Sequence, residues 1–399
     1  VRADGVEVRD FAGTQVEAKP YVEDWDASAA EKGGYDLFML KEIAEQPKAV
    51  ADALRGRIDP EQRIQLDETA LDDTVLRDIT KVVVVACGTA AHAGMVAKYA
   101  IEHWTRLPVD VELASEFRYR DPIVGPDALV IAISQSGETM DTLMALRHAK
   151  AQGARTLAIC NTVGSTIPRE SDAALYTYAG PEIAVASTKA FLTQIIASYL
   201  VGLYLAQARG TMFEDEIRAI LSDLGDMPQK VDLVLDTVEP IRDLARRFAD
   251  SPSVLFLGRH VGYPVALEGA LKLKELAYMH AEGFPAGELK HGPIALIEEG
   301  IPVIVVVPSP RGRAVLHDKI VSNIQEVRAR GASVIAIAEE GDEAIVGVAD
   351  HVIRVPETPT LMQPLVSTVP LQVFACELAT VKGHDVDQPR NLAKSVTVE

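Results

Sequence analysis

The sequence predicts an α/β protein of two similar domains, each a three-layer αβα unit around a parallel, doubly wound sheet. Apolar runs of strand length at 82–86 and 128–133 each lead through a small-residue turn into a helical pattern. The same succession returns about 170 residues later, because Gly88 and Gly258 each follow an apolar run. Strands that alternate with helices at this spacing favour a parallel sheet with helices on both faces.

The composition is that of a soluble globular protein. The 399 residues are 48% hydrophobic and 24% charged, and their number suggests two or three domains. A formal net charge of −19 argues against nucleic acid as a partner. Cys87, Cys160 and Cys376 lie far apart and are expected to be reduced thiols. We expect a cytoplasmic protein without a membrane partner, since no apolar stretch looks long enough to span a bilayer and no signal-peptide pattern is present.

Residues 1–34 are expected to be the tail of an upstream domain followed by a linker, because they are polar and acidic and position 1 is not Met. Two short strand-like pieces occur within them, at 6–8 and 14–16. A helical lead-in is predicted over 35–70, where Pro47 opens a second helix at its first turn.

The first domain is predicted to cover residues 71–211. Its expected strands are 82–86, 109–113, 128–133, 156–160 and 174–178. Its expected helices run from His92 to Trp104, from Met140 to Ala149, and from Glu182 to about Ala208. Ligands of such sheets bind beyond the carboxyl ends of the strands, so the turns that follow 82–86 and 128–133 should share one crevice.

A helical, acidic connector is expected over 212–250, and a second domain over 251–384. Its predicted strands are 254–257, 303–307 and 334–337, and its predicted helices are 263–284, one from about Val315, and one from about 371 to 382. Residues 385–399 form a tail with a Pro-Arg turn and a short apolar ending, as if the tail folds back over the protein.

The turn after 128–133 carries three hydroxyls, those of Ser134, Ser136 and Thr139. Free N–H groups and the positive end of the dipole at a helix N-terminus favour an anion, so this turn predicts a phosphate cradle. An ordinary N-cap, which needs one such residue, is the alternative. Glu138 opposes an anion unless its side chain turns outward. The second domain lacks these hydroxyls, which indicates one ligand per chain.

The turn after 82–86 reads Cys87-Gly88-Thr89-Ala90 and lacks the GxGxxG pattern. A dinucleotide site, and with it an NAD-dependent dehydrogenase, is therefore disfavoured. Cys87 could be drawn as a nucleophile, but no base accompanies it locally. A small residue that closes a strand is the stronger interpretation.

Glu268, Lys272 and Glu275 fall on one face of the predicted helix 263–284. A solvated Glu–Lys ladder is the common alternative. The loop 283–293 is rich in Gly and Pro and presents His291, which titrates near neutrality, and this favours a functional interpretation.

His280 is expected to cap or pack at the end of the same helix. Together with Glu282, Glu288 and His291 it could be drawn as a metal site. The spacing matches no metal-binding motif, so no metal is predicted.

Lys394 lies in the tail, where burial could remove its proton and leave an amine able to form an imine. A carboxylate base, a histidine and a lysine near one crevice suit proton transfer beside a carbonyl. These are the needs of a ketose–aldose isomerisation, with a phosphate as the remote handle that supplies binding energy.

Eight motifs, in this order, resemble the isomerase part of the glutamine–fructose-6-phosphate aminotransferase (glucosamine-6-phosphate synthase) family. They are CGTA, ASEFRYR, SQSGET, AICN, EIAVASTKAF, LEGALKLKE, GELKHGPIAL and DVDQPRNLAKSVTVE. The resemblance covers the chain after residue 35 and implies two sugar isomerase (SIS) domains with flavodoxin-like sheets. Residues 1–34 resemble the end of the family's glutaminase domain, whose N-terminal cysteine nucleophile is absent here.

The resemblance implies a role for each matching residue. Phosphate would be held by Ser134, Gln135, Ser136 and Thr139. The sugar site would be lined by Cys87, Gly88, Thr89, Val185, Ser187 and Ala393. Catalysis would fall to Glu275 as the base between C1 and C2, Lys272 as its assistant, His291 as the ring-opening acid/base from the neighbouring subunit, and Lys394 as the imine-forming lysine. Ala90 stands where the family often has Ser, which affects one sugar contact of about 1 kcal/mol.

The resemblance also implies the sugar-binding, isomerising half of an amino-sugar synthesis that supplies UDP-N-acetylglucosamine. Its ligands would be fructose 6-phosphate, glucose 6-phosphate and glucosamine 6-phosphate, and no cofactor is expected. It implies a homodimer and a glutaminase domain in the longer chain, without which hexose-phosphate isomerase activity is expected to remain. The alternative is a sugar-phosphate-sensing module without catalysis, which would not need Glu275, His291 and Lys394.

Overall fold

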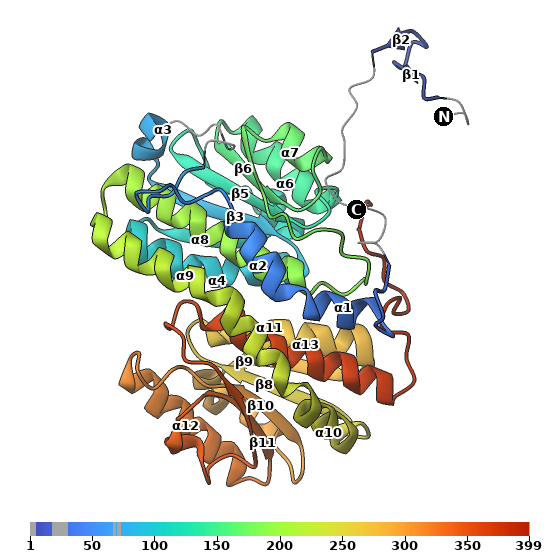
Figure 1. Ribbon diagram of the computed structural model, residues 1–399, viewed down its shortest axis with the longest axis vertical. Coiled ribbons are helices and arrows are strands. Elements are labelled where there is room, and N and C mark those ends of the chain that lie inside the picture. Colours follow the sequence, from blue (N-terminus) through green and yellow to red (C-terminus); the bar gives the residue numbers. More distant parts are fainter. Residues whose placement is uncertain (1–4, 18–30, 67–68, 70–72, 399) are drawn as a thin grey trace.

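The computed structural model describes residues 5–17, 31–66, 69 and 73–398. Its body contains two five-stranded sheets, one in the upper and one in the lower half of Figure 1. The strands of the first are β3 (Lys81–Ala86), β4 (Val109–Leu113), β5 (Ala128–Ser134), β6 (Arg155–Cys160) and β7 (Ala173–Tyr176). Those of the second are β8 (Ser253–Gly258), β9 (His280–Pro285), β10 (Pro302–Val306), β11 (Ser333–Glu339) and β12 (His351–Val355).

Both sheets have the same topology. The orders β4-β3-β5-β6-β7 and β12-β11-β10-β8-β9 each become 2-1-3-4-5 when strands are counted within their own sheet. Neighbouring strands pair in parallel throughout both sheets. The prediction of two copies of one doubly wound αβα domain is confirmed. The strand order reverses between β3 and β5 and between β8 and β10, and ligands of such sheets bind beyond the carboxyl ends at these points.

The helices lie on both faces of the sheets. Those before and within the first domain are α1 (Phe38–Ala44), α2 (Gln46–Leu54), α3 (Asp73–Asp78), α4 (Gly88–Thr105), α5 (Ala114–Phe117), α6 (Met140–Ala151), α7 (Thr166–Glu170) and α8 (Lys189–Arg209). The connector and second domain contain α9 (Glu214–Val234), α10 (Val238–Phe248), α11 (Gly262–Ala277), α12 (Ala314–Arg328) and α13 (Gln363–Val381). Short 3₁₀ segments are η3 (Arg118–Arg120), η4 (Leu235–Thr237), η5 (Ala286–His291), η6 (Pro293–Leu296) and η7 (Glu343–Ile345).

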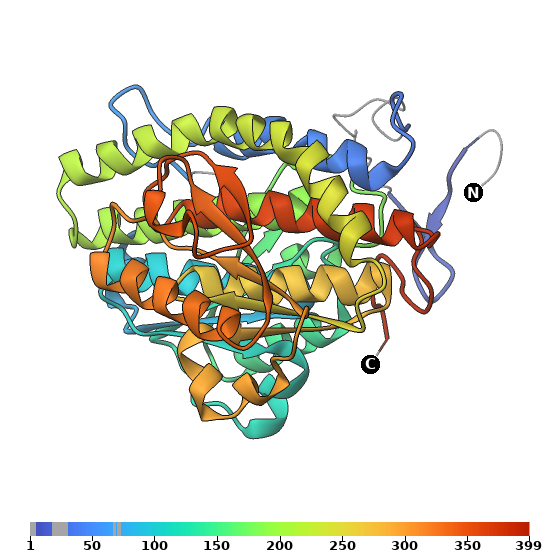
Figure 2. The ribbon, with the colours of Figure 1, turned by 90° about the horizontal axis from the view of Figure 1, so that it is seen from below.

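Helices fill the space between the two sheets. α4 packs on α8 and α11 packs on α13, and the two pairs lie between the sheets in Figures 1 and 2. One hydrophobic core runs through both pairs and includes Ile101, Leu200, Val265 and Phe374. The two domains are therefore joined by a continuous apolar layer, which fixes the positions of polar groups at their junction.

α8 and α13 are apolar almost all round. By length and composition both could cross a membrane, contrary to the expectation that no stretch is long enough, but 89% of the apolar stretch of each is buried inside the protein. A helix that is hydrophobic on every face occurs in the core of a large domain. Here both helices serve as core helices between the sheets.

Two predicted helices of the second domain have different ends in the structure. α11 stops at Ala277, because Tyr278 turns into the left-handed region, and the residues that follow form β9. His280 therefore begins a strand and does not cap a helix. β9 is an edge strand whose sequence, HAEGFP, has no apolar run, so periodicity alone could not identify it. α13 begins at Gln363, earlier than predicted, and accommodates Pro370 within the helix.

The first domain shows one comparable difference. α8 begins at Lys189 and not at 182, because residues 182–188 form a loop. At the N-terminal end, β1 (Val8–Arg9) and β2 (Gln15–Val16) pair antiparallel. These strands overlap the two strand-like pieces predicted at 6–8 and 14–16. The predicted linker falls largely on residues 18–30, outside the described residues.

Candidate active site

The hydroxyl-rich turn gathers its three hydroxyls at the start of α6. Ser134 Oγ lies 3.0 Å from Thr139 Oγ1 and accepts a hydrogen bond from the N–H of Gly137 at 3.0 Å. Ser136 Oγ accepts from the N–H of Glu138 at 3.2 Å. Gly137 adopts φ +67°, and a Cβ there would come within 1.9 Å of Ser165 Oγ. The turn therefore needs glycine at this point, and it presents hydroxyls where a helix dipole favours an anion.

Glu138 does not oppose an anion in this turn. Its Oε1 accepts a hydrogen bond from the N–H of Thr166 at 2.7 Å, just where α7 begins. The carboxylate is therefore directed out of the turn, where it satisfies a free N–H at the start of another helix. This removes the objection that the sequence raised.

The C-terminal tail crosses the same turn. Ser395 Oγ donates to Ser136 Oγ at 3.0 Å, and the carbonyl of Val396 accepts from the N–H of Met140 at 3.1 Å. Further back, the carboxylate of Asp387 accepts from the N–H groups of Phe38 and Met39, both at 3.0 Å. The tail is thus held at the first residues of α1 and of α6, and Lys394 directly precedes the residue that contacts the hydroxyl-rich turn.

Lys394 meets a buried carboxylate that sequence reasoning missed. Its Nζ lies 2.7 Å from Glu182 Oε2 and donates to the carbonyl of Ala184 at 2.7 Å. Glu182 is fully buried, and its Oε1 accepts from the N–H groups of Thr188 and Ala190 at 2.8 and 3.1 Å. Burial alone would raise the pKa of Glu182, but Lys394 and the backbone donors lower it below its ordinary value. The amine therefore faces an anion, whereas the sequence suggested burial that could remove its proton.

Glu42 is a second carboxyl group that the sequence did not reveal. Its Oε1 accepts the N–H groups of Ile183 and Ala184. Burial, together with the negative charge of Glu182, raises the pKa of Glu42 to about 8. Glu42 thus keeps its proton at neutral pH beside the carboxylate that holds Lys394.

Glu268, Lys272 and Glu275 of α11 do not form a solvated ladder. Lys272 Nζ lies 2.6 Å from Glu275 Oε2 and 3.4 Å from Glu268 Oε1, and the side chain of Lys272 is 1% exposed. The close contact with Glu275 is an ion pair without hydrogen-bond geometry. Burial would lower the pKa of Lys272, but Glu275 and Glu268 raise it above its ordinary value. Lys272 is consequently a buried cation.

Glu268 joins this cluster to the first domain. It accepts a hydrogen bond from Thr89 Oγ1 at 2.9 Å and lies 2.7 Å from His92 Nδ1, both on α4. The negative charge of Glu182 also acts on Lys272. The α11 cluster, the turn after β3 and the loop that receives the tail are therefore electrostatically connected at the domain junction.

Other predicted site residues approach Glu182, contact the tail or lie in the two turns. Ser187 Oγ lies 3.5 Å from Glu182 Oε1, and the N–H of Val185 donates to the carbonyl of Asp387 at 3.0 Å. The carbonyl of Gln135 accepts the N–H groups of Asn161 and Thr162. Gly88 opens α4, and Ala393 is exposed in the tail.

Two predicted residues stand apart from the cluster. Cys87 is half-buried, its Sγ lies 3.8 Å from Thr142 Oγ1, and burial raises its pKa, as expected of a packing thiol rather than a nucleophile. His291 is exposed at the end of η5, and no hydrogen bond or ion pair joins it to the other predicted site residues that the structure describes. Within the described residues, no group of three His, Cys, Asp or Glu side chains is placed to hold a metal ion.

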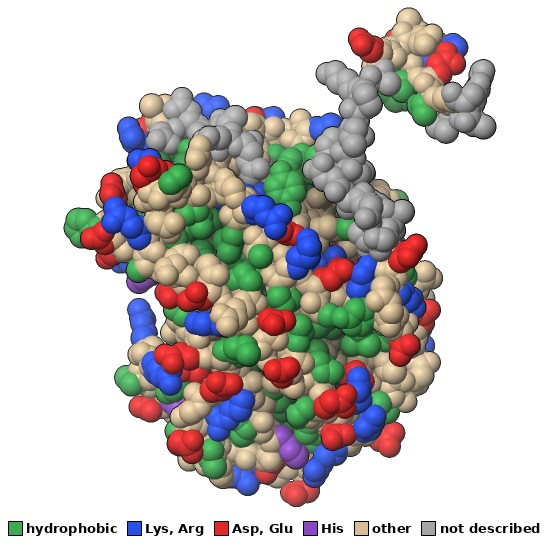
Figure 3. Space-filling view, in the orientation of Figure 1, with side chains coloured by type: hydrophobic (Ala, Val, Ile, Leu, Met, Phe, Trp, Pro, Cys, Tyr) green, Lys and Arg blue, Asp and Glu red, His purple; other side chains and the backbone are tan. Residues whose placement is uncertain are grey.

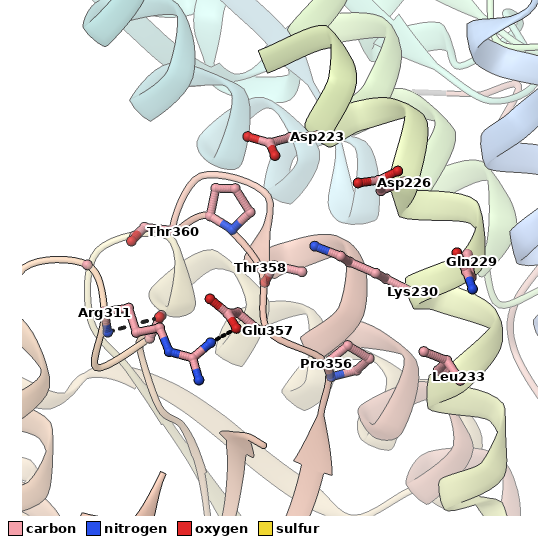
Figure 4. Close-up of a pocket in the computed structure, with 13 residues that line it drawn as sticks. Asp223, Asp226, Gln229, Lys230, Leu233, Arg311, Pro356, Glu357, Thr358 and Thr360 are labelled. Carbon is pink, nitrogen blue, oxygen red and sulfur yellow. Dashed lines mark hydrogen bonds and ion pairs between the residues drawn. The ribbon is translucent and has the colours of Figure 1, made fainter. Parts of the chain in front are cut away.

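A cavity of about 610 Å³ opens away from this cluster, between α9 and the loops after β10 and β12 (Figure 4). Asp223, Asp226 and Lys230 of α9 face it from one side, and Arg311 and Glu357 from the other. None of the predicted site residues lines it.

Comparison with known proteins agrees with this fold. The model of the SIS domain family matches residues 75–203 and 247–382. The glutamine–fructose-6-phosphate aminotransferase (isomerizing) of Streptomyces coelicolor is 72% identical over 399 residues, and that of Corynebacterium diphtheriae is 68% identical over 400. All of this chain is covered, but it spans only 65% and 64% of the length of these two relatives.

Two solved structures extend the comparison. The C-terminal domain of glucosamine-fructose-6-phosphate aminotransferase from Francisella tularensis is 41% identical with a TM-score of 0.85, and the match covers 90% of this chain and 100% of that domain. The tagatose-6-phosphate ketose/aldose isomerase from Escherichia coli has a TM-score of 0.71 at 20% identity, over 92% of this chain and 98% of the other, which shows the shared fold alone. The chain therefore belongs to the SIS domain family, as a double-SIS protein related to the C-terminal domain of glucosamine-fructose-6-phosphate aminotransferase.

Proposed function

We propose that this chain binds fructose 6-phosphate, forms an imine with it through Lys394, and converts the ketose into the 2-amino aldose glucosamine 6-phosphate. The observation that carries the proposal is the path of the tail. Ser395 donates to Ser136 at 3.0 Å, so the residue that follows Lys394 in the chain contacts the turn predicted to hold the phosphate, while the amine of Lys394 lies on Glu182. An amine on the residue next to one that contacts an anion-binding turn suits a sugar phosphate, whose carbonyl and ester lie at opposite ends of one short carbon chain.

The phosphate would take the hydroxyls of Ser134, Ser136 and Thr139, with Gln135 beside them. In the structure Ser395 donates to Ser136, and Val396 accepts from Met140 N. Phosphate oxygens are acceptors, so they would take the N–H of Met140 in place of the Val396 carbonyl and would accept from the hydroxyls of Ser136 and Ser395.

Proton transfer would be the task of the α11 cluster. Lys394 attacks C2 of the open-chain ketose, the carbonyl oxygen leaves as water, and ammonia then replaces the lysine on C2. Glu275 removes a proton from C1 and returns it to C2, while the buried cation of Lys272, 2.6 Å from Glu275, stabilises the carboxylate before the proton is taken and after it is returned. Thr89, Cys87, Gly88, Val185, Ser187 and Ala393 would surround the sugar.

His291 would act from a second copy of the chain. It lies exposed at the end of η5, so it is available to a neighbour. In the proposed homodimer, His291 of the partner subunit opens the sugar ring by passing a proton. A glutaminase domain of the longer protein would supply ammonia, and this part of the chain alone would convert fructose 6-phosphate to glucose 6-phosphate, in the cytosol.

The test is reductive trapping of the imine. Fructose 6-phosphate and borohydride should attach one sugar to wild-type protein and none to Lys394→Ala, as read by intact mass and peptide mapping. Lys274→Ala is the matched control, because Lys274 is an exposed lysine of α11 and should leave labelling unchanged. Full labelling of Lys394→Ala would remove this residue from the imine role. Sugar-phosphate binding without any trapping in the wild type would favour the sensing module instead.

A further inference from the structure

The second domain has a cavity at its own switch point. It measures about 370 Å³ and is bounded by the end of α4, by the turn after β8 and by the loop that leads into α12. β8 and β10 are the strands between which the order of the second sheet reverses. The cavity therefore lies at the same place in the second domain as the predicted crevice in the first domain, which is formed by the turns after β3 and β5.

Four basic side chains line this cavity. His103 and Arg106 come from the end of α4, His260 follows β8, and Arg313 precedes α12. Neither guanidinium has a hydrogen bond or ion pair with any residue that the structure describes. This is unusual in a chain with 58 Asp and Glu against 39 Lys and Arg, whose surface mixes the two signs (Figure 3).

The acid that lines the cavity is already engaged. Glu102 Oε1 accepts from the N–H of Val109 at 3.0 Å and lies 3.7 Å from Lys98 Nζ. Arg311, on the same loop as Arg313, offers the contrast: it pairs with Glu339 at 3.0 Å and with Glu357, and it faces the other cavity (Figure 4). The loop thus directs Arg311, whose charge is paired, to the 610 Å³ cavity, and Arg313, whose charge is not paired with any described residue, to the 370 Å³ cavity.

His260 is held in a costly conformation at the wall of the cavity. Its φ is +53°, in the left-handed region that non-glycine residues rarely adopt, and its Nδ1 is buried without a hydrogen-bond partner among the described residues. Its ring lies 4.5 Å from that of Tyr99. Burial, then the positive charges of Arg313 and His103, lower its pKa. Backbone strain and an unused buried nitrogen at one residue are features of binding sites.

We propose that this cavity is a second binding site of the chain, and that it takes a small phosphorylated molecule. Arginine presents a planar fork that binds two phosphate oxygens at once, and Arg106 and Arg313 approach the cavity from different domains. Tyr99 offers an apolar face for the body of the ligand, and the volume lies in the range of small-molecule sites. A ligand held by both arginines would also bridge the two domains. The inference does not rest on the proposed function, because it uses none of the residues assigned there.

The probe is inorganic pyrophosphate, titrated by calorimetry into the full chain with fructose 6-phosphate in excess to fill the site at the hydroxyl-rich turn. We expect pyrophosphate to bind the wild type, and Arg106→Gln or Arg313→Gln to weaken its affinity by about tenfold each, as for the loss of a charged hydrogen bond. His260→Asn should weaken it too, because Asn tolerates the left-handed backbone while the imidazole is lost. Arg155→Gln is the matched control, since Arg155 is exposed at the amino end of β6, and it should bind like the wild type.

Three results would overturn the proposal: no pyrophosphate binding by the wild type, equal affinity in all the arginine variants, or loss of binding in Ser136→Ala with retention in Arg313→Gln. The last result would place the anion at the hydroxyl-rich turn. A thermal melt of each variant checks its fold, and both arginines are exposed, so their replacement should leave the Tm unchanged. If fructose 6-phosphate fails to bind at all, the proposed function fails, while the difference between Arg313→Gln and Arg155→Gln still decides this inference.

Discussion

Replacing Glu268 with glutamine should loosen the junction between the two domains. The side chain is fully buried, accepts from Thr89 at 2.9 Å, and faces the cation of Lys272 at 3.4 Å and the ring of His92 at 2.7 Å. Glutamine keeps the shape and an acceptor for Thr89. It removes the negative charge that Lys272 faces and replaces one of the two acceptor oxygens by an NH₂ donor.

The expected loss follows from the burial of the cluster. Removal of one partner from a buried ion pair costs about 3–5 kcal/mol, because the remaining charge is left without compensation. Here Glu275 stays 2.6 Å from Lys272, and the bond from Thr89 is retained, so the loss should be at the lower end, about 3 kcal/mol. For a chain of this length such a loss lowers the Tm by about 4 °C.

The dependence on pH gives the sharper test. Burial opposes ionisation of Glu268, but Lys272, His92 and Thr89 lower its pKa below the ordinary value of 4.5. A carboxyl group with a lowered pKa contributes stability that is present above its ordinary pKa and is lost as the pH falls through the folded value. The Tm difference between wild type and Glu268→Gln should therefore be full at neutral pH and shrink below pH 4.5.

Differential scanning calorimetry across this pH range measures the effect, with Glu326→Gln as the matched control. Glu326 lies 2.8 Å from Lys290, whose side chain is 59% exposed, and such a surface pair is worth about 0–1 kcal/mol. Equal Tm losses for both variants at neutral pH, or a loss for Glu268→Gln that does not change with pH, would refute the reasoning.

Three further predictions concern the proposed site and its surroundings. Glu275→Gln should stop exchange of solvent protons into the sugar, followed by NMR in heavy water, while sugar-phosphate binding persists; continued exchange would move the role of base to another group, Glu268 first. Mixing inactive His291→Ala and Lys394→Ala chains should restore some activity, and no recovery in verified mixed dimers would place the site within one chain. Burial and the negative charge of Glu182 raise the pKa of Glu42 from 4.5 to about 8. Between these pH values Glu42 is ionised in the unfolded protein and protonated in the folded protein, so the wild type loses stability as the pH rises. The Tm of Glu42→Gln minus that of the wild type should therefore increase over the same pH range. A difference that does not change with pH would contradict a raised pKa of Glu42.

Much of the fold could be predicted because buried parallel strands have a distinctive sequence. β3 and β5 are covered on both faces and are therefore apolar from Val82 to Ala86 and from Ala128 to Ile133. β9 could not be found in this way, because it lies at the edge of its sheet and is only partly buried. The predicted start of α8 at 182 is wrong. Apolar residues at 183–186 suit a helix, but the carboxylate of Glu182 accepts from the N–H groups of Thr188 and Ala190 and holds the residues before α8 in a loop.

The candidate site was less accessible to sequence reasoning, because its contacts join distant parts of the chain. Lys394 pairs with Glu182, and Glu182 acts on Glu42, and no periodicity relates residues so far apart. Helical spacing did place Lys272 beside Glu268 and Glu275, but it could not show that Glu268 and Lys272 are buried between the domains. The SIS assignment is confirmed, whereas the roles of the individual site residues stay predictions.

The double anchoring of the tail has a consequence for how any anion reaches the hydroxyl-rich turn. The N–H of Met140 donates to the carbonyl of Val396, and the hydroxyl of Ser136 accepts from Ser395. An incoming anion must therefore displace contacts that the last residues of the tail already make. The N–H of Met140 can pass from the carbonyl of Val396 to an anion oxygen, whereas the hydroxyl of Ser395, which donates to Ser136, needs a new acceptor, such as the anion itself. Lys394 is held separately by Glu182 and the carbonyl of Ala184, so the last residues can rearrange around an anion while the amine keeps its position.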